Sequence, residues 1–228
     1  MAAILFGSAV RVYGVFGRCF KLLVTIIALS IPSLASAEPV VIAALGDSLT
    51  QGYGLARKDG FVPQLEGWLT AQGEDVRIMN AGVSGDTTAG GLARIDWTLT
   101  PDVQALIVIL GGNDILRGID PASSRANLEA ILEVATGRDL PVLLVGMPAP
   151  ANFGLDYKAR FDALYPELAK KYGTLFLADF FAPLLEGSAK IPALKYMQAD
   201  GIHPNAAGVV EIVGTIGPVV RLLIERSR

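Results

Sequence analysis

The chain holds a single histidine, His203, and a serine whose surroundings suit nucleophilic attack. Ser48 follows an apolar run within the stretch GDSLTQGYG. A serine hydroxyl is a weak nucleophile, and it needs a base within hydrogen-bonding reach that is itself oriented by a third group. His203 is the one imidazole that could be this base, and Asp200 precedes it by three residues, across Gly201. On a turn this spacing would return the carboxylate to the ring, so the three residues suit acyl transfer through a covalent intermediate.

Acyl transfer also needs hydrogen-bond donors for the charge that develops on the carbonyl oxygen. Gly82 offers a backbone N–H with no side chain in the way, and Asn113 offers an amide after the Gly111-Gly112 turn. The backbone N–H of Ser48 would complete the oxyanion hole. Taken singly, these residues are also compatible with ordinary turns and helix caps, and an isolated Asp-x-x-His pair is compatible with a surface histidine in a capping turn.

The serine loop differs from three other loops that it superficially matches. It lacks the lysine of a phosphate-binding Walker loop and the spacing of a dinucleotide-binding G-x-G-x-x-G. Thr50 stands where the nucleophile elbow G-x-S-x-G needs its last glycine, which argues against the α/β-hydrolase fold. Ser84, in a second glycine-rich segment, is a rival nucleophile to Ser48.

Short β-prone runs alternate with longer helical patterns along the chain. Most of the runs are nearly continuously apolar, which is typical of parallel strands covered on both faces. The expected strands are Val40–Leu45, Val76–Met79, Ala105–Leu110, Val142–Val145 and Leu175–Ala178. The expected helices are Phe61–Ala71, Thr88–Trp97, Ser123–Thr136, Tyr157–Lys171 and Asn205–Glu225. This alternation predicts a three-layer α/β/α sandwich with a central, mostly parallel five-stranded sheet, whose ligands bind outside the carboxyl ends of the strands.

Five further residues predict where helices begin and end. Ser123 or Ser124 would cap the third expected helix, and Asn205 would cap the last one. Gly137 and Gly173 are expected helix stops.

The first 37 residues have the pattern of a secretory signal peptide. Arg11, Arg18 and Lys21 precede the apolar stretch Leu22–Leu34, which is followed by Ala35-Ser36-Ala37. This stretch is shorter than the roughly 20 residues that cross a bilayer, which argues against a membrane anchor. We expect cleavage after Ala37, a single domain over residues 38–228, a periplasmic or secreted protein, and no stable membrane insertion after cleavage.

Composition limits the partners of that domain. Three of the 19 basic side chains and none of the 22 acidic ones lie in residues 1–37, so the remaining 191 residues carry a net charge of −6. This charge argues against nucleic acid or an anionic membrane surface as the main partner. The domain contains no cysteine, so disulfides cannot stabilise it. No feature of the sequence indicates an oligomeric state.

Four segments, GDSLTQGYG, NAGVSGDTTAGG, LGGNDILRG and DGIHPNAAG, occur in an order and spacing that resembles the SGNH (GDSL) hydrolases. The resemblance is greatest to the bacterial branch of acyl-CoA thioesterases, lysophospholipases and arylesterases, and it runs from about Val40 to Gly208. It implies a flavodoxin-like α/β fold and chemistry without a metal or cofactor. It also implies a role for each matching residue: Ser48 as nucleophile, Asp200 and His203 as the other triad members, and Gly82 and Asn113 as oxyanion donors. Asp47 is expected to support the loop.

The residues that follow Asn113 and the fourth expected strand suggest the substrate. Apolar side chains in these two loops would line a groove for a fatty acyl chain, although each could instead anchor its loop on the core. They are Leu116 and Ile119 after the Asn113 segment, and Met147, Pro148, Pro150, Phe153 and Leu155 after the fourth strand. In relatives these loops border the acyl site, so we expect an esterase or thioesterase for acyl esters, aryl esters or lysophospholipids.

Two alternatives remain open on the sequence. A carbohydrate O-acetylesterase would use the same triad, with Tyr53, Phe153 and Tyr157 as candidates for stacking on a sugar. A non-catalytic domain would use the glycine-rich loops to bind an anion. The esterase predicts activity that falls as pH drops through the range in which a histidine takes up a proton, because the base must be neutral.

Overall fold

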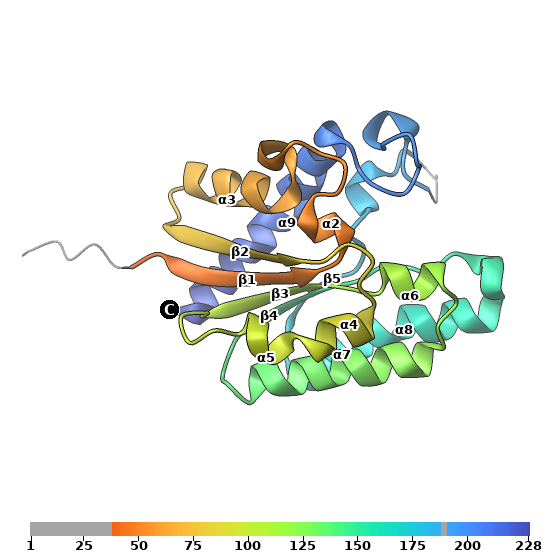
Figure 1. The fold of residues 1–228 in the computed structure, drawn as a ribbon, viewed down its shortest axis with the longest axis horizontal. Coiled ribbons are helices and arrows are strands. Elements are labelled where there is room, and N and C mark those ends of the chain that lie inside the picture. Colours follow the sequence, from red (N-terminus) through yellow and green to blue (C-terminus); the bar gives the residue numbers. More distant parts are fainter. Residues whose placement is uncertain (1–37, 188–190) are drawn as a thin grey trace, which may run out of the picture. The chain divides into compact units, whose positions relative to one another are not determined.

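Five parallel strands form the centre of the fold (Figure 1). The computed structural model describes residues 38–187 and 191–228, so the predicted signal peptide lies outside the described residues. The strands are β1 (Val40–Gly46), β2 (Val76–Gly82), β3 (Ala105–Ile109), β4 (Val142–Val145) and β5 (Leu175–Leu177), in the order β2-β1-β3-β4-β5. Every neighbouring pair is parallel, which confirms the predicted sheet. β2 continues beyond its predicted end as far as Gly82, which therefore lies opposite Gly46 of β1.

Helices cover both faces of this sheet (Figure 1). α3 (Phe61–Ala71) and α9 (Ala206–Ser227) pack together on one face, and α4 (Thr88–Ala93), α5 (Ile95–Thr98), α7 (Pro121–Thr136) and α8 (Leu155–Tyr172) lie on the other. Two short helices, α2 (Ser48–Gln51) and α6 (Gly112–Leu116), follow the carboxyl ends of β1 and β3. The short 3₁₀ turns are η1 (Arg57–Asp59), η2 (Ala151–Phe153), η3 (Ala182–Leu184) and η4 (Leu194–Tyr196). The result is the predicted three-layer sandwich.

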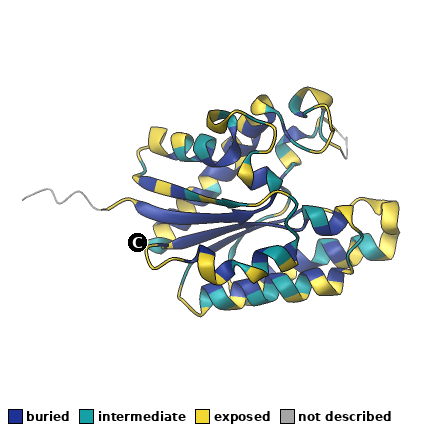
Figure 2. Cartoon of the chain, in the orientation of Figure 1, coloured by how far each residue is buried: buried dark blue, intermediate teal, exposed yellow. Residues whose placement is uncertain are grey.

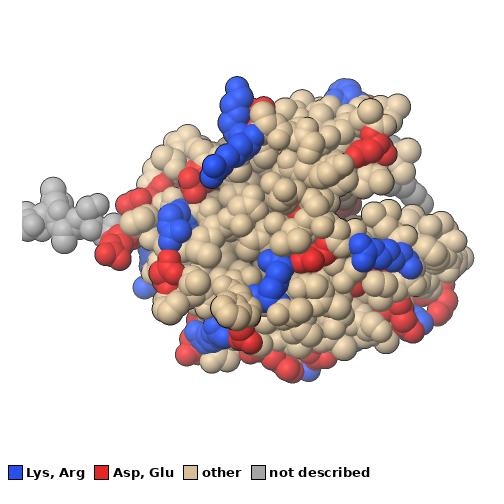
Figure 3. All heavy atoms as spheres, in the orientation of Figure 1, with Lys and Arg blue, Asp and Glu red and all other residues tan. Residues whose placement is uncertain are grey.

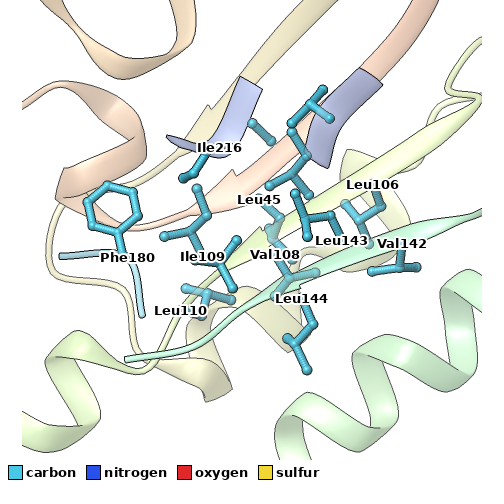
Figure 4. Packing of buried hydrophobic residues seen from close by; sticks show 14 of the residues in the cluster. Leu45, Leu106, Val108, Ile109, Leu110, Val142, Leu143, Leu144, Phe180 and Ile216 are labelled. Atoms are coloured by element: carbon cyan, nitrogen blue, oxygen red, sulfur yellow. The ribbon is translucent and has the colours of Figure 1, made fainter. Parts of the chain in front are cut away.

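The core lies between the sheet and its helices, where three of the five strands are the most deeply buried elements (Figure 2). β1, β3 and β4 are buried along their whole length, while the edge strand β2 alternates between buried and exposed residues. Figure 4 shows Ile216 of α9 and Phe180, just after β5, beside the sheet residues Leu45 and Ile109. Burying one such side chain stabilises the fold by about 1.5–3 kcal/mol.

The expected helix Thr88–Trp97 is two helices, α4 and α5, separated at Arg94. Gly90 and Gly91 lower the helix propensity of the first half. The Arg94 guanidinium donates to Asp86 Oδ2 at 2.7 Å and to the carbonyl of Gly46 at 2.9 Å. The break between α4 and α5 thus lies at a residue whose side chain bonds the end of β1.

The predicted cap of α7 was wrong. Asp120 caps this helix, because its carboxylate accepts from the backbone N–H of Ala122 and Pro121 occupies the first helical position. Ser124 Oγ instead donates to the buried carboxylate of Asp114 at 2.8 Å. The other cap predictions are confirmed: Asn205 accepts from Gly208 N at the start of α9, and Gly173 ends α8 in the left-handed conformation. Helix α7 also ends as predicted, with Gly137 as its C-cap.

The sheet and the described core lie within one compact unit, Pro39–Arg228. A unit with its own core has what a domain needs to fold by itself. Helix α9 is long and apolar enough to cross a membrane by length and composition, but half of its most apolar stretch is buried, and α9 packs on the sheet and α3.

Candidate active site

Ser48 is held at the carboxyl edge of the sheet by the turn that ends β1. Asp47 caps α2, because its Oδ1 accepts from Leu49 N at 3.0 Å, and Ser48 is the first residue of the helix. Gly46 has no room for a side chain, since a Cβ there would lie 2.0 Å from Thr50 Oγ1. This tight strand-to-helix turn fixes the position of the serine hydroxyl.

His203 joins Ser48 to Asp200. Its Nε2 lies 2.8 Å from Ser48 Oγ, and its Nδ1 lies 2.6 Å from Asp200 Oδ2. With the ring proton on Nδ1, the ring donates to the carboxylate and Nε2 accepts from the serine hydroxyl. The structure therefore brings together the three predicted triad residues in the order that an activated serine requires.

Hydrogen bonds within the turn hold the loop that carries Asp200 and His203. Gly201 has a φ of +67°, which closes the turn, and Asp200 Oδ1 accepts from the backbone N–H groups of Ile202 and His203 at 2.9 and 3.0 Å. These bonds, the one from His203 N first, lower the pKa of Asp200 to about 2. Asp200 is therefore ionised at neutral and mildly acidic pH. The Tyr53 ring lies 4.8 Å from the imidazole, centroid to centroid.

The two other predicted oxyanion donors come from segments either side of β1, one at the end of β2 and one just after β3. Gly82 ends β2, and a Cβ there would come within 2.3 Å of Gln51 N, so only glycine lets the two backbones approach. Its N–H donates to Asn80 Oδ1 at 3.0 Å. Asn113, in α6 after β3, donates through Nδ2 to Asp47 Oδ2 at 3.1 Å, which leaves the second proton of that amide to bind another acceptor.

Two buried carboxylates support this arrangement. Burial, opposed by the bonds from Leu49 N and Asn113, raises the pKa of Asp47 to about 6. Asp114 is fully buried and accepts from Thr88 N at 2.9 Å, from Thr88 Oγ1 at 2.6 Å and from Ser124 Oγ. It therefore links α4 and α7 to α6, the helix that carries Asn113.

A cavity of about 440 Å³ opens beside Ser48 and His203. Of the residues predicted to contact the acyl group, four line this cavity: Leu116, Met147, Pro148 and Pro150. Ile119, Phe153 and Leu155 are not among the lining residues. Phe153 packs against Gly118 and the ring of Tyr157, whose hydroxyl donates to the carbonyl of Ile119, and Leu155 is 77 % exposed.

A family model described as the GDSL-like Lipase/Acylhydrolase family matches residues 44–209. The chain belongs to this family. It is 38 % identical over 191 residues to "Esterase TesA" of Pseudomonas aeruginosa, covering 83 % of this chain and 91 % of that protein. It is 36 % identical over 175 residues to "Thioesterase 1/protease 1/lysophospholipase L1" of Escherichia coli, covering 75 % and 77 %. A solved structure of AlinE4, described as an SGNH-hydrolase family esterase, is 44 % identical with a TM-score of 0.67, covering 82 % of this chain and 97 % of the other. The protein is accordingly an SGNH-type carboxylic ester hydrolase.

Sequence reasoning missed one wall of this hydrolase's cavity. Asp179, Phe181, Leu185 and Pro192, which follow β5, line it together with Ile202 of the histidine loop. The rule that pointed to the ends of the first four strands applies equally to the fifth, so the signal was present. Asp179 is half-buried there, and this burial raises the pKa of its carboxyl.

Ser84, the rival nucleophile, also lines the cavity of the SGNH hydrolase. Its hydroxyl donates to Gln51 Oε1 at 2.5 Å, whereas the imidazole of His203 bonds Ser48. Within residues 38–187 and 191–228, no group of three or more His, Cys, Asp or Glu side chains is arranged to hold a metal ion.

Proposed function

We propose that this hydrolase cleaves its ester through a covalent acyl-enzyme on Ser48. The observation that carries the proposal is the 2.8 Å contact between Ser48 Oγ and His203 Nε2, with Asp200 behind the ring. Ser48 Oγ attacks the acyl carbon while Nε2 takes its proton. The alcohol or thiol leaves with that proton, and water then hydrolyses the acyl-enzyme with His203 acting again as base. Asp200 holds the ring and stabilises the imidazolium.

The backbone N–H groups of Ser48 and Gly82 and the Asn113 amide would bind the oxyanion. The N–H of Gly82 would then exchange Asn80 Oδ1 for the developing charge, while Asn113 would use its second proton and keep its bond to Asp47. Each such donor is typically worth about 3–4 kcal/mol of transition-state stabilisation. Because Asp47 and Asn80 already orient these groups, little reorganisation is needed when charge develops.

The substrates we propose are carboxylic esters or thioesters with an apolar acyl or aryl part, including lysophospholipids. The names of the relatives from P. aeruginosa and E. coli, and the apolar cavity walls Leu116, Met147 and Pro148, support this choice. We further propose that residues 1–37 are a cleaved signal peptide and that the enzyme works in the periplasm or outside the cell. In that location the enzyme meets little acyl-CoA, so we propose lysophospholipids or exogenous esters as its natural substrates.

Hydrolysis of p-nitrophenyl esters with acyl chains from C2 to C16 tests the activity and its range. Ser48→Ala removes the proposed nucleophile, and Ser84→Ala is the matched control in the same cavity. We expect a medium-chain optimum that is lost in Ser48→Ala and retained in Ser84→Ala. An optimum at C2 would keep the triad but favour the carbohydrate O-acetylesterase, and loss in Ser84→Ala alone would overturn the assignment of Ser48.

Signal cleavage is tested separately. Expression of the full chain in a Gram-negative host should yield periplasmic or secreted protein whose amino-terminal residue is Glu38. Recovery of uncleaved protein in the cytoplasm would contradict the proposed export.

A further inference from the structure

Exposed large hydrophobic side chains gather at one edge of the molecule. Among the described residues eleven are exposed, and only Trp97 of α5 and Val210 and Leu222 of α9 lie away from the carboxyl ends of the strands. The other eight all lie in segments that follow a strand end or in the histidine loop. Because carboxyl ends of parallel strands meet at the same edge of a sheet, these side chains surround the candidate active site.

Six of the eight form what we term the apolar rim: Leu116, Phe153, Leu155, Ile191, Leu194 and Ile202. Leu194 and Ile191 are 84 % and 74 % exposed. Leu116 and Ile202 are exposed to solvent and line the cavity as well. The rim is therefore continuous with the cavity beside Ser48. Exposed apolar patches of this kind on a soluble domain mark interaction sites.

Charges near the rim are largely balanced. Lys195 pairs with Glu186 at 2.6 Å beside Leu194, and Arg160 pairs with Asp120 and lies near Asp156 below Leu155. In Figure 3 uncharged atoms predominate around the hollow at this edge (right), with one Lys or Arg group directly below it. With a net charge of −6 over residues 38–228, an anionic surface would repel the domain, while a zwitterionic or neutral one would not.

From these observations we infer that the apolar rim docks the enzyme on a zwitterionic or neutral lipid–water surface, with the cavity mouth facing the lipid. The rim side chains stand on separate loops, so each inserts individually among headgroups and acyl chains. An acyl chain that leaves the lipid then passes over Leu116 and Ile202 into the cavity without crossing water. The inference rests on the proposed function only for the identity of the substrate that enters the cavity, since docking itself needs no turnover.

Vesicle flotation measures docking directly. The protein used is residues 38–228 carrying Ser48→Ala, because this unit holds the whole described core and the variant cannot degrade the lipid. We expect binding to phosphatidylcholine vesicles, and weaker binding when half of the lipid is phosphatidylglycerol. Leu194→Ser and Ile191→Ser should each weaken binding about tenfold, the loss expected for one aliphatic side chain that no longer leaves water. Trp97→Ser and Leu222→Ser, at positions away from the rim that are 87 % and 49 % exposed, are the controls and should bind as the parent does.

Three results would overturn the inference: no flotation with phosphatidylcholine, binding only to phosphatidylglycerol, or equal losses in rim and control variants. Analytical ultracentrifugation adds a fourth, since self-association that Leu194→Ser abolishes would assign the rim to a second copy of the chain. Hydrolysis of a soluble short-chain ester, measured in Leu194→Ser with Ser48 intact, should equal that of the parent. If that ester is not cleaved even by the parent, the proposed function fails while docking remains measurable.

Discussion

At the scale of single residues, the site depends on carboxylates that orient the reacting groups. Asp47 accepts from Leu49 N to start α2 and from Asn113 to orient the amide, so one buried carboxylate serves both the nucleophile and an oxyanion donor. Asp200 also makes two kinds of bond: its Oδ1 accepts from the backbone of the loop, and its Oδ2 bonds the imidazole.

Asn113→Ala should lower kcat by about 10²–10³-fold, because it removes one preorganised oxyanion donor and leaves two backbone donors in place. KM should change little, since the ground-state carbonyl makes weaker use of this amide. Steady-state hydrolysis of a p-nitrophenyl ester measures the effect, with thermal unfolding as a check on the fold. A loss of less than about fivefold would remove Asn113 from the oxyanion hole.

Acid should inactivate the enzyme through one group. The pKa of Asp200 is lowered to about 2 by its bonds to His203 and Ile202, so this carboxylate stays ionised in mildly acidic solution. We expect kcat/KM to fall tenfold per pH unit on the acid side of the profile, because the base that takes the serine proton must be neutral. A hundredfold fall per unit would mean that a second group, with Asp47 as the first candidate, must also be ionised.

Asp47 should make stability depend on pH. Burial raises its pKa from 3.8 to about 6, so between these values the unfolded chain loses a proton that the folded protein keeps. Its effect therefore destabilises the fold as pH rises through this window, by up to about 3 kcal/mol. The free energies of unfolding of Asp47→Asn and the parent are measured in urea at pH 4 and 7. The value for the variant, relative to that for the parent, should be higher at pH 7 than at pH 4. Taking the difference between the two proteins cancels the effect of other titrating groups, and a difference that is the same at both pH values would contradict the raised pKa.

At the scale of elements, short helices at the strand ends place the chemistry, and buried polar bonds hold them. Arg94 interrupts the expected helix Thr88–Trp97 where it binds Asp86 and the end of β1. Asp114 joins α4, α6 and α7 through Thr88 and Ser124. Local propensity would not reveal either role, because each depends on a partner far along the chain.

Asp114→Ala should lower the free energy of unfolding by about 3 kcal/mol, because it leaves the buried N–H and hydroxyl of Thr88 and the hydroxyl of Ser124 without an acceptor. Ser124→Ala, which removes a single bond, should cost about 1 kcal/mol. Asp96→Ala, at an exposed ion pair with Arg138, is the control and should change stability by no more than about 0.5 kcal/mol. Equal effects of Asp114→Ala and Asp96→Ala in urea titrations would show that the buried cluster contributes nothing special.

At the scale of the whole molecule, the sheet brings together site residues from nearly the whole length of the domain. Ser48 and His203 are 155 residues apart, yet their side chains meet at the edge where β1 ends. The described core lies within Pro39–Arg228, and α9, far along the chain from β1, packs on the sheet and α3.

Residues 38–228 alone should therefore unfold cooperatively, with the same midpoint in urea as the full chain and the same kcat on a soluble ester. Circular dichroism during a urea titration and a p-nitrophenyl assay measure the two properties. A shorter piece that ends before α9 is the control and should fail to fold, because it exposes the sheet face that α9 covers. A midpoint that shifts on removal of residues 1–37 would show that they contribute to the folded domain.

The sequence by itself determined the parallel sheet, the caps at Asn205 and Gly173, and the candidate triad, because these follow from apolar runs, local hydrogen-bonding residues and a lone histidine. Only the tertiary structure decided that α7 is capped by Asp120 rather than by Ser123 or Ser124, since Ser124 has a buried partner in Asp114. It likewise decided which apolar loop residues line the cavity and which face water. Met147 and Phe153 are both apolar and both follow β4, but only Met147 lines the cavity, while Phe153 packs on Gly118 and Tyr157. Apolar character requires only that a side chain find a neighbour, and which neighbour it finds is a property of the packed loops.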